Sequence, residues 1–148
     1  MIDPALAASI IAASPDVTLV VAPDGSISGA AGPLAALLGW EPDELIGRSI
    51  EVLVPSSSVP EHVRLRVDYE RHPAARPMAD GAVRAARHRN GRRVQVEVGL
   101  APMPDRPGSV AVTVRDATTR LRHESEREHH RRHAQAVIAV GAERDRIA

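Results

Sequence analysis

The stretch RHRNGRRVQVEVGL at residues 87–100 decides the fold of this chain. At its centre, Asn90-Gly91 is the dipeptide most favoured in a two-residue type I′ β-hairpin turn. Apolar residues then alternate with Gln95, Glu97 and Gly99 from position 94 to position 100. Because successive side chains of a strand point to opposite faces, we expect a strand with one buried, aliphatic face and one polar face.

Strands on both sides extend this hairpin into a sheet. Residues 82–88 form the strand before the turn, and the proline-rich turn PMPDRPG at 102–108 follows the strand after it. The segment VAVTV at 110–114 repeats the alternation, which stops at Arg115-Asp116. Three consecutive antiparallel strands are therefore expected in the second half of the chain.

The first half begins with a helix and a second hairpin. Asp3-Pro4, an N-cap followed by a proline at the first helical position, opens a short amphipathic helix within residues 2–13. A β-branched run at 17–22 and an alternating run at 26–29 flank Pro23-Asp24-Gly25, in which Asp-Gly is a hairpin signal. Two further antiparallel strands are expected here.

Helical pieces occupy the middle of the chain. Residues 33–60 contain short apolar segments separated by glycine and proline, and Gly39 and Gly47 stand where a left-handed C-cap would end a helix. Residues 59–72 fit a longer helix that Pro73 stops. These helices are expected to cover one face of the sheet, which makes the fold class α+β.

Composition limits what the protein does. The 148 residues are 43% apolar and 26% charged, which predicts one globular domain with an appendage. The sequence has neither a run of about 18 apolar residues nor a basic apolar start, so no membrane partner is expected and a cytoplasmic location is the default. The net charge is zero, with one Trp, one Tyr and no Phe, so direct nucleic-acid binding is not expected. No motif of a known catalytic site is present, which indicates a regulatory protein and not an enzyme.

Four segments in register resemble the PAS family of sensor domains. They are ASPDVTLVVAPDGSI at 13–27, LLGWEPDELIGRSIEVLVP at 37–55, RHRNGRRVQVEVGLAPMP at 87–104 and VAVTVRDATTR at 110–120. The resemblance implies a PAS fold with a five-stranded antiparallel sheet and short helices on one face. It divides the chain into an N-terminal helix at 1–13, a PAS sensor domain at 14–116 and a C-terminal signalling helix at 117–148.

The resemblance also implies an output. In PAS sensors an Asp-x-Thr links the sheet to the output helix, and Asp116-Ala117-Thr118 matches it, although Asp116 also suits an ordinary helix cap. The segment AERDRIA at 142–148 resembles the stretch before the phosphoacceptor histidine of one class of sensor histidine kinases. We therefore expect a two-component sensor that forms a homodimer, with a kinase core in cis and a response regulator as partners of the parent protein. Neither the signal nor the direction of regulation follows from the sequence.

Candidate ligand residues come from the same resemblance. In haem-binding PAS sensors a histidine on the long helix ligates iron and a tyrosine follows two turns later, and His62 and Tyr69 have this spacing. A histidine that is merely packed or exposed is the favoured interpretation of His62, because a lone His on a helix is more often structural. Arg76 is a candidate for binding a carboxylate or phosphate of a small-molecule ligand.

Other cofactor chemistry is less compatible with the sequence. The chain has no cysteine, which excludes the cysteinyl–flavin photoadduct of light sensors. His129 and His133 share a helix face, but two ligands make a poor zinc site, so no metal site is expected. Three hypotheses stay open: a sensor of an unidentified ligand, a haem-based gas sensor that uses His62, and a ligand-free scaffold for dimerisation or docking.

Overall fold

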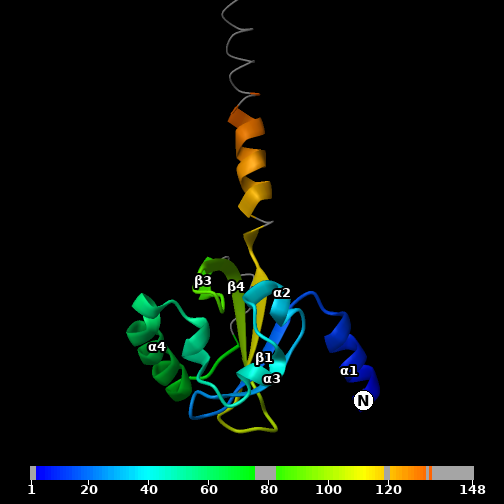
Figure 1. Ribbon diagram of the computed structural model, residues 1–148, viewed down its shortest axis with the longest axis vertical. Helices are drawn as coiled ribbons and strands as arrows, with labels where there is room; N and C mark the ends of the chain where they lie inside the picture. Colours follow the sequence, from blue (N-terminus) through cyan, green and yellow to red (C-terminus); the bar gives the residue numbers. More distant parts are fainter. Residues whose placement is uncertain (1–2, 76–82, 119–120, 133, 135–148) are drawn as a thin grey trace, which may run out of the picture. The chain divides into compact units, whose positions relative to one another are not determined.

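The computed structural model describes residues 3–75, 83–118, 121–132 and 134 (Figure 1). Two compact units divide the chain, residues 1–116 and residues 117–148, and each is described separately.

A five-stranded antiparallel sheet is the centre of the first unit, as the sequence predicts. Its spatial order is β2-β1-β5-β4-β3, so the last strand in the sequence is the middle strand of the sheet. The strands are β1 (Val17–Val21), β2 (Ile27–Ala31), β3 (Val83–Arg87), β4 (Arg93–Pro102) and β5 (Val110–Asp116).

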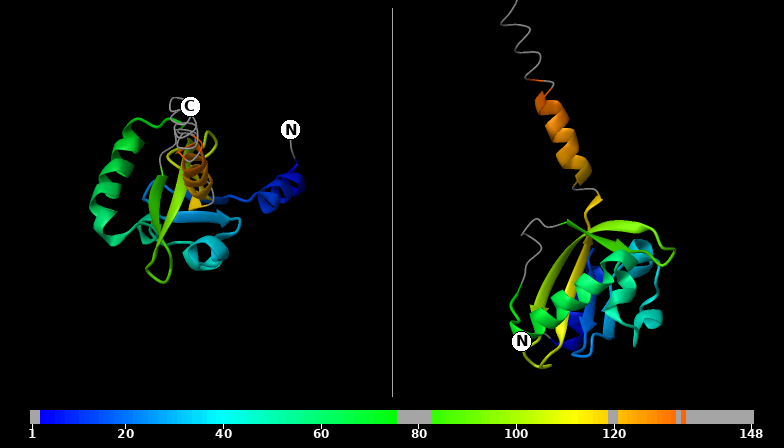
Figure 2. Two further views of the ribbon diagram at one scale, coloured as in Figure 1. Left: turned by 90° about the horizontal axis from the view of Figure 1, so that it is seen from above. Right: turned by 90° about the vertical axis from the view of Figure 1, so that its left-hand side faces the viewer.

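Helices cover one face of this sheet. They are α2 (Leu34–Leu38), α3 (Pro42–Leu45), α4 (Val59–Arg71) and the 3₁₀ turns η1 (Ile50–Leu53) and η2 (Ser56–Ser58). Gly39 caps α2 with a φ of 77°, and Gly47, just after α3, has a φ of 86°, as their positions in the sequence predict. Helix α1 (Pro4–Ala13) stands on the other side of the sheet from α4 (Figures 1 and 2).

The two hairpins β1–β2 and β3–β4 share one loop design, which differs from the predicted type I′ turn. In the second hairpin the Gly91 N–H donates to the His88 carbonyl, and the His88 N–H donates to the Arg92 carbonyl. Gly91 alone has a positive φ, of 92°, whereas Asn90 does not. This is a three-residue loop with a type I turn and a left-handed glycine, so the prediction of a two-residue loop was wrong. The Asn90 side chain accepts from the Arg92 N–H and holds the turn.

The core joins the sheet to α2 and α3. Leu34 and Leu38 of α2, Leu45 at the end of α3, and Leu19 and Ile27 of the sheet are each at most 1% exposed. They belong to one cluster that continues through the valines of β4 and β5. Close packing of aliphatic side chains therefore holds this part of the fold, as expected for a chain without phenylalanine.

The outward face of β4 is less polar than predicted. Gln95 is exposed, but Glu97 is only 5% exposed. Glu97 lies opposite Arg115 in the β4–β5 register, so a cation on the neighbouring strand compensates the buried carboxylate. Strand alternation correctly placed Glu97 on the outer face but did not predict its burial.

The second unit contains the predicted exit helix. Residues 121–132 are helical, and Arg132 pairs with Glu128 one turn earlier along the helix. His133 and the segment 142–148 lie outside the described residues. Within the described part of the chain, no helix is both long and apolar enough to cross a bilayer.

Candidate functional site

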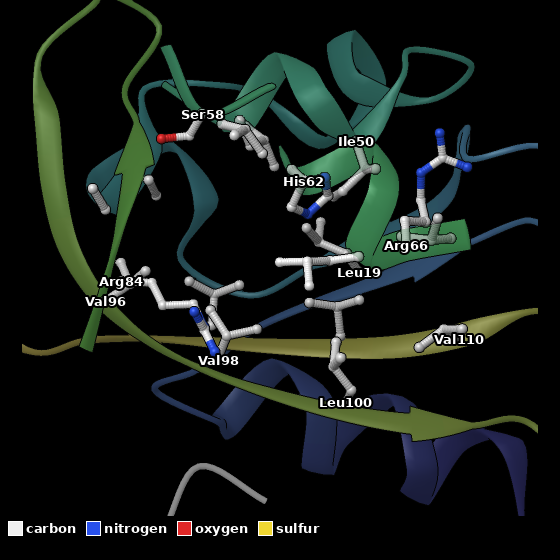
Figure 3. A pocket seen from close by; sticks show the side chains of 18 of the residues that line it. Leu19, Ile50, Ser58, His62, Arg66, Arg84, Val96, Val98, Leu100 and Val110 are labelled. Atoms are coloured by element: carbon white, nitrogen blue, oxygen red, sulfur yellow. The ribbon is translucent and has the colours of Figure 1, made fainter. Parts of the chain in front are cut away.

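A pocket of about 410 Å³ lies between α4, η1 and the sheet (Figure 3). Its floor consists of aliphatic side chains from the sheet, and its polar groups come from α4 and β3. The lining includes Leu19, Ile50, Leu53, Val96, Val98, Leu100, Val112, Ser58, Glu61, His62, Leu65, Arg66, Tyr69 and Arg84. This volume is in the lower part of the range for small-molecule sites, roughly 300–1,000 Å³.

The amino-acid sequence of α4 explains why a cavity remains beneath this helix. Tyr69 is the one buried residue of α4, while Leu65 is 52% exposed even though it lines the pocket. Opposite α4 the sheet presents valines and the small residues Ala85 and Ala86. Because the side chains that line the pocket from the two layers do not meet, the space between them is not filled.

Polar contacts hold α4 in place. The Arg66 Nε donates to Glu51 Oε1 of η1 at 2.9 Å, and the Ser49 hydroxyl donates to the same carboxylate. Burial raises the pKa of Glu51, but the hydrogen bonds from Ser49 and Arg66 outweigh it, so that the pKa of this carboxyl lies below its ordinary value. Glu51 is therefore an anion at neutral pH that ties α4 to η1.

His62 lies between this carboxylate and the pocket. Its ring points from α4 toward Leu19 on the sheet (Figure 3). Its Nδ1 is buried and 3.5 Å from Glu51 Oε1, within ion-pair range, yet the geometry is not that of a hydrogen bond. His62 is thus a pocket residue with one nitrogen beside a carboxylate.

The other predicted site residues, for ligand binding and for signal transmission, have different outcomes. Tyr69 lines the pocket, and its hydroxyl donates to the Ala74 carbonyl at 2.7 Å. Arg76 lies outside the described residues. Asp116 is the last residue of β5, and Thr118 occupies a helical position two residues later. His62 and Tyr69 therefore line the same cavity. Asp116 and Thr118 do not line it and belong to the end of β5 and to the segment after it.

Arg84 of β3 also lines the pocket, although it is not among the predicted site residues. In the β3–β4 register it lies opposite Val96, whose side chain is 1% exposed and faces the helices. Figure 3 shows the Arg84 side chain entering the pocket beside Val98. No hydrogen bond or ion pair to its guanidinium is found among the described residues.

The turn prediction explains why Arg84 was missed. A two-residue loop at Asn90-Gly91 would pair Arg84 with Glu97, and the arginine would then point to the outer face. The three-residue loop shifts the register by one, which turns Arg84 to the inner face. The backbone pairing of His88 with Arg92 sets this register, and the prediction did not include it.

No cluster of three or more metal-ligating side chains occurs in the ranges that the structure describes. His129 is in the helical segment, whereas His133 lies outside those ranges.

Comparison with known proteins establishes the family. A model of the PAS fold matches residues 6–117, so this chain belongs to the PAS family. The predicted resemblance and the predicted fold class are both confirmed. PAS domains are in general sensory and not catalytic, which makes this chain a signal-sensing domain. No curated protein sequence is significantly similar to it.

Solved structures with the same fold come from several bacterial regulators. A domain of a sensory box sensor histidine kinase/response regulator from Geobacter sulfurreducens has 18% identity and a TM-score of 0.61, over 74% of this chain and 90% of that one. A PAS domain from Colwellia psychrerythraea has 15% identity and a TM-score of 0.65, over 76% and 95%. The RpfR quorum-sensing receptor PAS domain of Cronobacter turicensis, solved in complex with BDSF, has 13% identity and a TM-score of 0.59, over 73% and 99%. At these identities the likeness concerns the fold alone.

Proposed function

We propose that this PAS domain senses a small molecule bound between α4 and the sheet, and that it regulates a histidine kinase. The observation that carries the proposal is the aliphatic cavity of about 410 Å³, which contains several polar groups at its wall. A folded domain fills its interior when nothing else has to occupy it, so a cavity of this size favours a ligand. RpfR, which has the same fold, was solved with a small ligand in its PAS domain.

Native mass spectrometry of the chain, purified without added cofactors, tests ligand binding. A bound small mass is expected, and Val98→Trp should remove it by filling the pocket. Leu65→Trp is a second filling variant on a half-exposed helix position, for the case in which the strand variant does not fold. Circular dichroism checks both folds. A ligand-free wild type would contradict small-molecule sensing and favour the scaffold hypothesis.

The kinase output is the second part of the proposal. Its supports are the AERDRIA segment at 142–148, the Asp116-Ala117-Thr118 junction and a solved neighbour of the same fold from a sensor histidine kinase. Ligand binding would shift the junction between two states only if its affinity for the two differs. The full-length protein should become phosphorylated on histidine when incubated with ATP and should transfer the phosphoryl group to a response regulator. Asp116→Ala should uncouple this rate from ligand binding while the pocket still binds the ligand, and a full-length protein without autokinase activity would refute this output.

A homodimer through the terminal helices completes the proposal. On α1, Leu6, Ile10 and Ile11 are 41–52% exposed, and no residue of α1 is buried. An apolar helix face of this kind favours a protein partner. Light scattering should show a dimer that Leu6→Asp with Ile10→Asp weakens, whereas Ala8→Asp, at another exposed position of α1, should have less effect. A wild-type monomer at micromolar concentration would contradict this part.

Haem is the alternative ligand, because His62 and Tyr69 both line the pocket. The pocket of about 410 Å³ is in the lower part of the range for small-molecule sites, which favours a ligand smaller than a porphyrin. The Glu51 carboxylate beside Nδ1 also provides His62 with a structural role. An absorbance spectrum decides the matter, since a haem sensor would show a Soret band that His62→Ala abolishes.

A further inference from the structure

We infer that the ligand is an aliphatic monocarboxylate whose head group binds Arg84 at the pocket wall and whose chain lies over the valines of the sheet. This inference rests on the proposed function and names the chemical class that the same pocket would take. Its basis is Arg84, which has no hydrogen-bond or ion-pair partner among the described residues and lies on the inner face of an otherwise aliphatic sheet.

The charges around the pocket assign the head group. Two arginines line the cavity, but Arg66 is already paired with Glu51 at 2.9 Å and lies 3.8 Å from Glu70. Arg84 has no such acid among the described residues, and Glu61 of α4, the exposed acid in the lining, is not within ion-pair distance of it. Arg84 provides one positive charge, and Glu61 adds a negative charge elsewhere in the lining. This balance favours a singly charged anion over a phosphate dianion.

The position of Arg84 also fixes the orientation of the ligand. Arg84 is exposed on the edge strand β3, so its guanidinium is open to solvent on one side. Beyond it, toward the centre of the sheet, the lining becomes aliphatic through Val98, Leu100 and Val112 (Figure 3). A carboxylate at Arg84 remains hydrated, while the chain attached to it leaves water, which is the favourable arrangement for an amphiphile.

The volume limits the length of the chain. At about 30 Å³ per non-hydrogen atom, the liquid volume of one water, a cavity of about 410 Å³ has room for about 14 such atoms. Two of them are carboxylate oxygens, which leaves a chain of up to about twelve carbons. Longer chains would have to extend into solvent or displace α4.

Titration calorimetry with three probes tests the inference: decanoate, 1-decanol and hexanoate. Decanoate is expected to bind most tightly, hexanoate more weakly because it buries less chain, and decanol more weakly because it lacks the charge. Arg84→Met keeps the apolar stem and should weaken decanoate about ten- to hundredfold, the range of a hydrogen bond to a charged group, while leaving decanol unchanged. Arg84→Lys should fall between the two, because a lysine keeps the charge but loses the bidentate geometry.

Matched controls locate the effect. Arg64→Met removes the same charge from an exposed position of α4 that does not line the pocket, and it should leave decanoate affinity unchanged. Val98→Trp and Leu65→Trp should reduce binding of both ten-carbon probes, which places them in the cavity. Raising the salt concentration from 50 to about 500 mM should weaken the binding of decanoate but not of decanol, since salt screens an exposed ion pair.

Two results would overturn the inference in different ways. If decanol binds as tightly as decanoate and both are lost in Val98→Trp, the pocket is a ligand site but Arg84 does not select a carboxylate. If none of the probes binds, the carboxylate class is wrong. The native mass of the purified chain then decides separately whether the pocket has another occupant.

Discussion

The two ends of the sheet are covered in contrasting ways. In the filled half, α2 and α3 pack against β1 and β2, and Leu34 and Leu45 are at most 1% exposed. In the hollow half, α4 lies over β3, β4 and β5 above a cavity of about 410 Å³, and the ion pair between Arg66 and Glu51 holds it to η1. One sheet thus supports a half built for stability and a half that leaves room for a ligand. The difference arises from which side chains each helix directs at the sheet: α2 and α3 bury leucines, whereas α4 presents the polar His62 and Arg66 and a half-exposed Leu65.

Leucine truncation should reveal this contrast with the largest effect. Leu45→Ala in the filled half should cost about 3 kcal/mol of unfolding free energy, because it opens a void in a packed core. Leu65→Ala in the hollow half should cost less than about 1 kcal/mol, since this side chain is half exposed and alanine favours the helix. Urea unfolding, followed by circular dichroism, measures both. Equal losses would contradict the division into two halves.

Enlarging a valine should show the same contrast between the two halves, with a smaller effect. Val17→Leu adds a methylene where the side chain is 0% exposed, and overpacking should destabilise the domain by about 1–3 kcal/mol. Val98→Leu enters the cavity, so the change should lie within about 0.5 kcal/mol of zero or be stabilising. The same unfolding experiment serves for the pair. A strongly destabilised Val98→Leu would mean that the hollow half is already tightly packed.

Acid should weaken the attachment of α4 in the hollow half, with the smallest effect of the three changes. The pKa of Glu51 lies below its ordinary value in the folded state, so this carboxylate contributes stability above about pH 4.3 that is lost as the pH falls through the folded pKa. The contribution should be below about 1 kcal/mol, since solvent screens the pair. Glu51→Gln should reduce the loss of stability between pH 7 and pH 3.5.

Hydrogen exchange localises the acid effect. After correction for the pH dependence of intrinsic exchange, the amides of α4 should lose protection at low pH in the wild type, whereas the protection of those in α2 should not change. Glu61→Gln, at an exposed position of the same helix, is the matched control and should behave like the wild type. An equal acid response in α2 and α4 would show that Glu51 does not tie α4 to the fold.

Local patterns were enough to predict most of the fold. Residues 59–72 predicted α4 because helical periodicity ends at Pro73, and alternation predicted β4 and β5 closely. The hairpin loop was predicted incorrectly, because Asn90-Gly91 is compatible with both a two-residue and a three-residue loop. The choice between them depends on which face of β3 packs against the helices, a tertiary property.

The candidate site was less predictable than the fold. Family resemblance singled out His62 and Tyr69, and both line the pocket. Whether Arg84 faces the pocket depends on the register of the hairpin, because a shift of one residue exchanges the two faces of the strand. The pairing of Glu51 with Arg66, 15 residues later, could not be read from either segment alone. The cavity is the space that the side chains of α4 and the sheet do not fill, and no local sequence pattern predicts it.

Strand order also determines when this domain can assemble on the ribosome. In the order β2-β1-β5-β4-β3 the two hairpins are joined only through β5, the last strand to be synthesised. Each hairpin has short-range pairings and can form early, but the sheet stays in two pieces until Val110–Asp116 emerges. The ion pair between Asp16 and Arg115 then closes a separation of 99 residues. A nascent chain can therefore complete its sensor only after residue 116 has emerged from the ribosome, when translation has already passed into the segment that follows it.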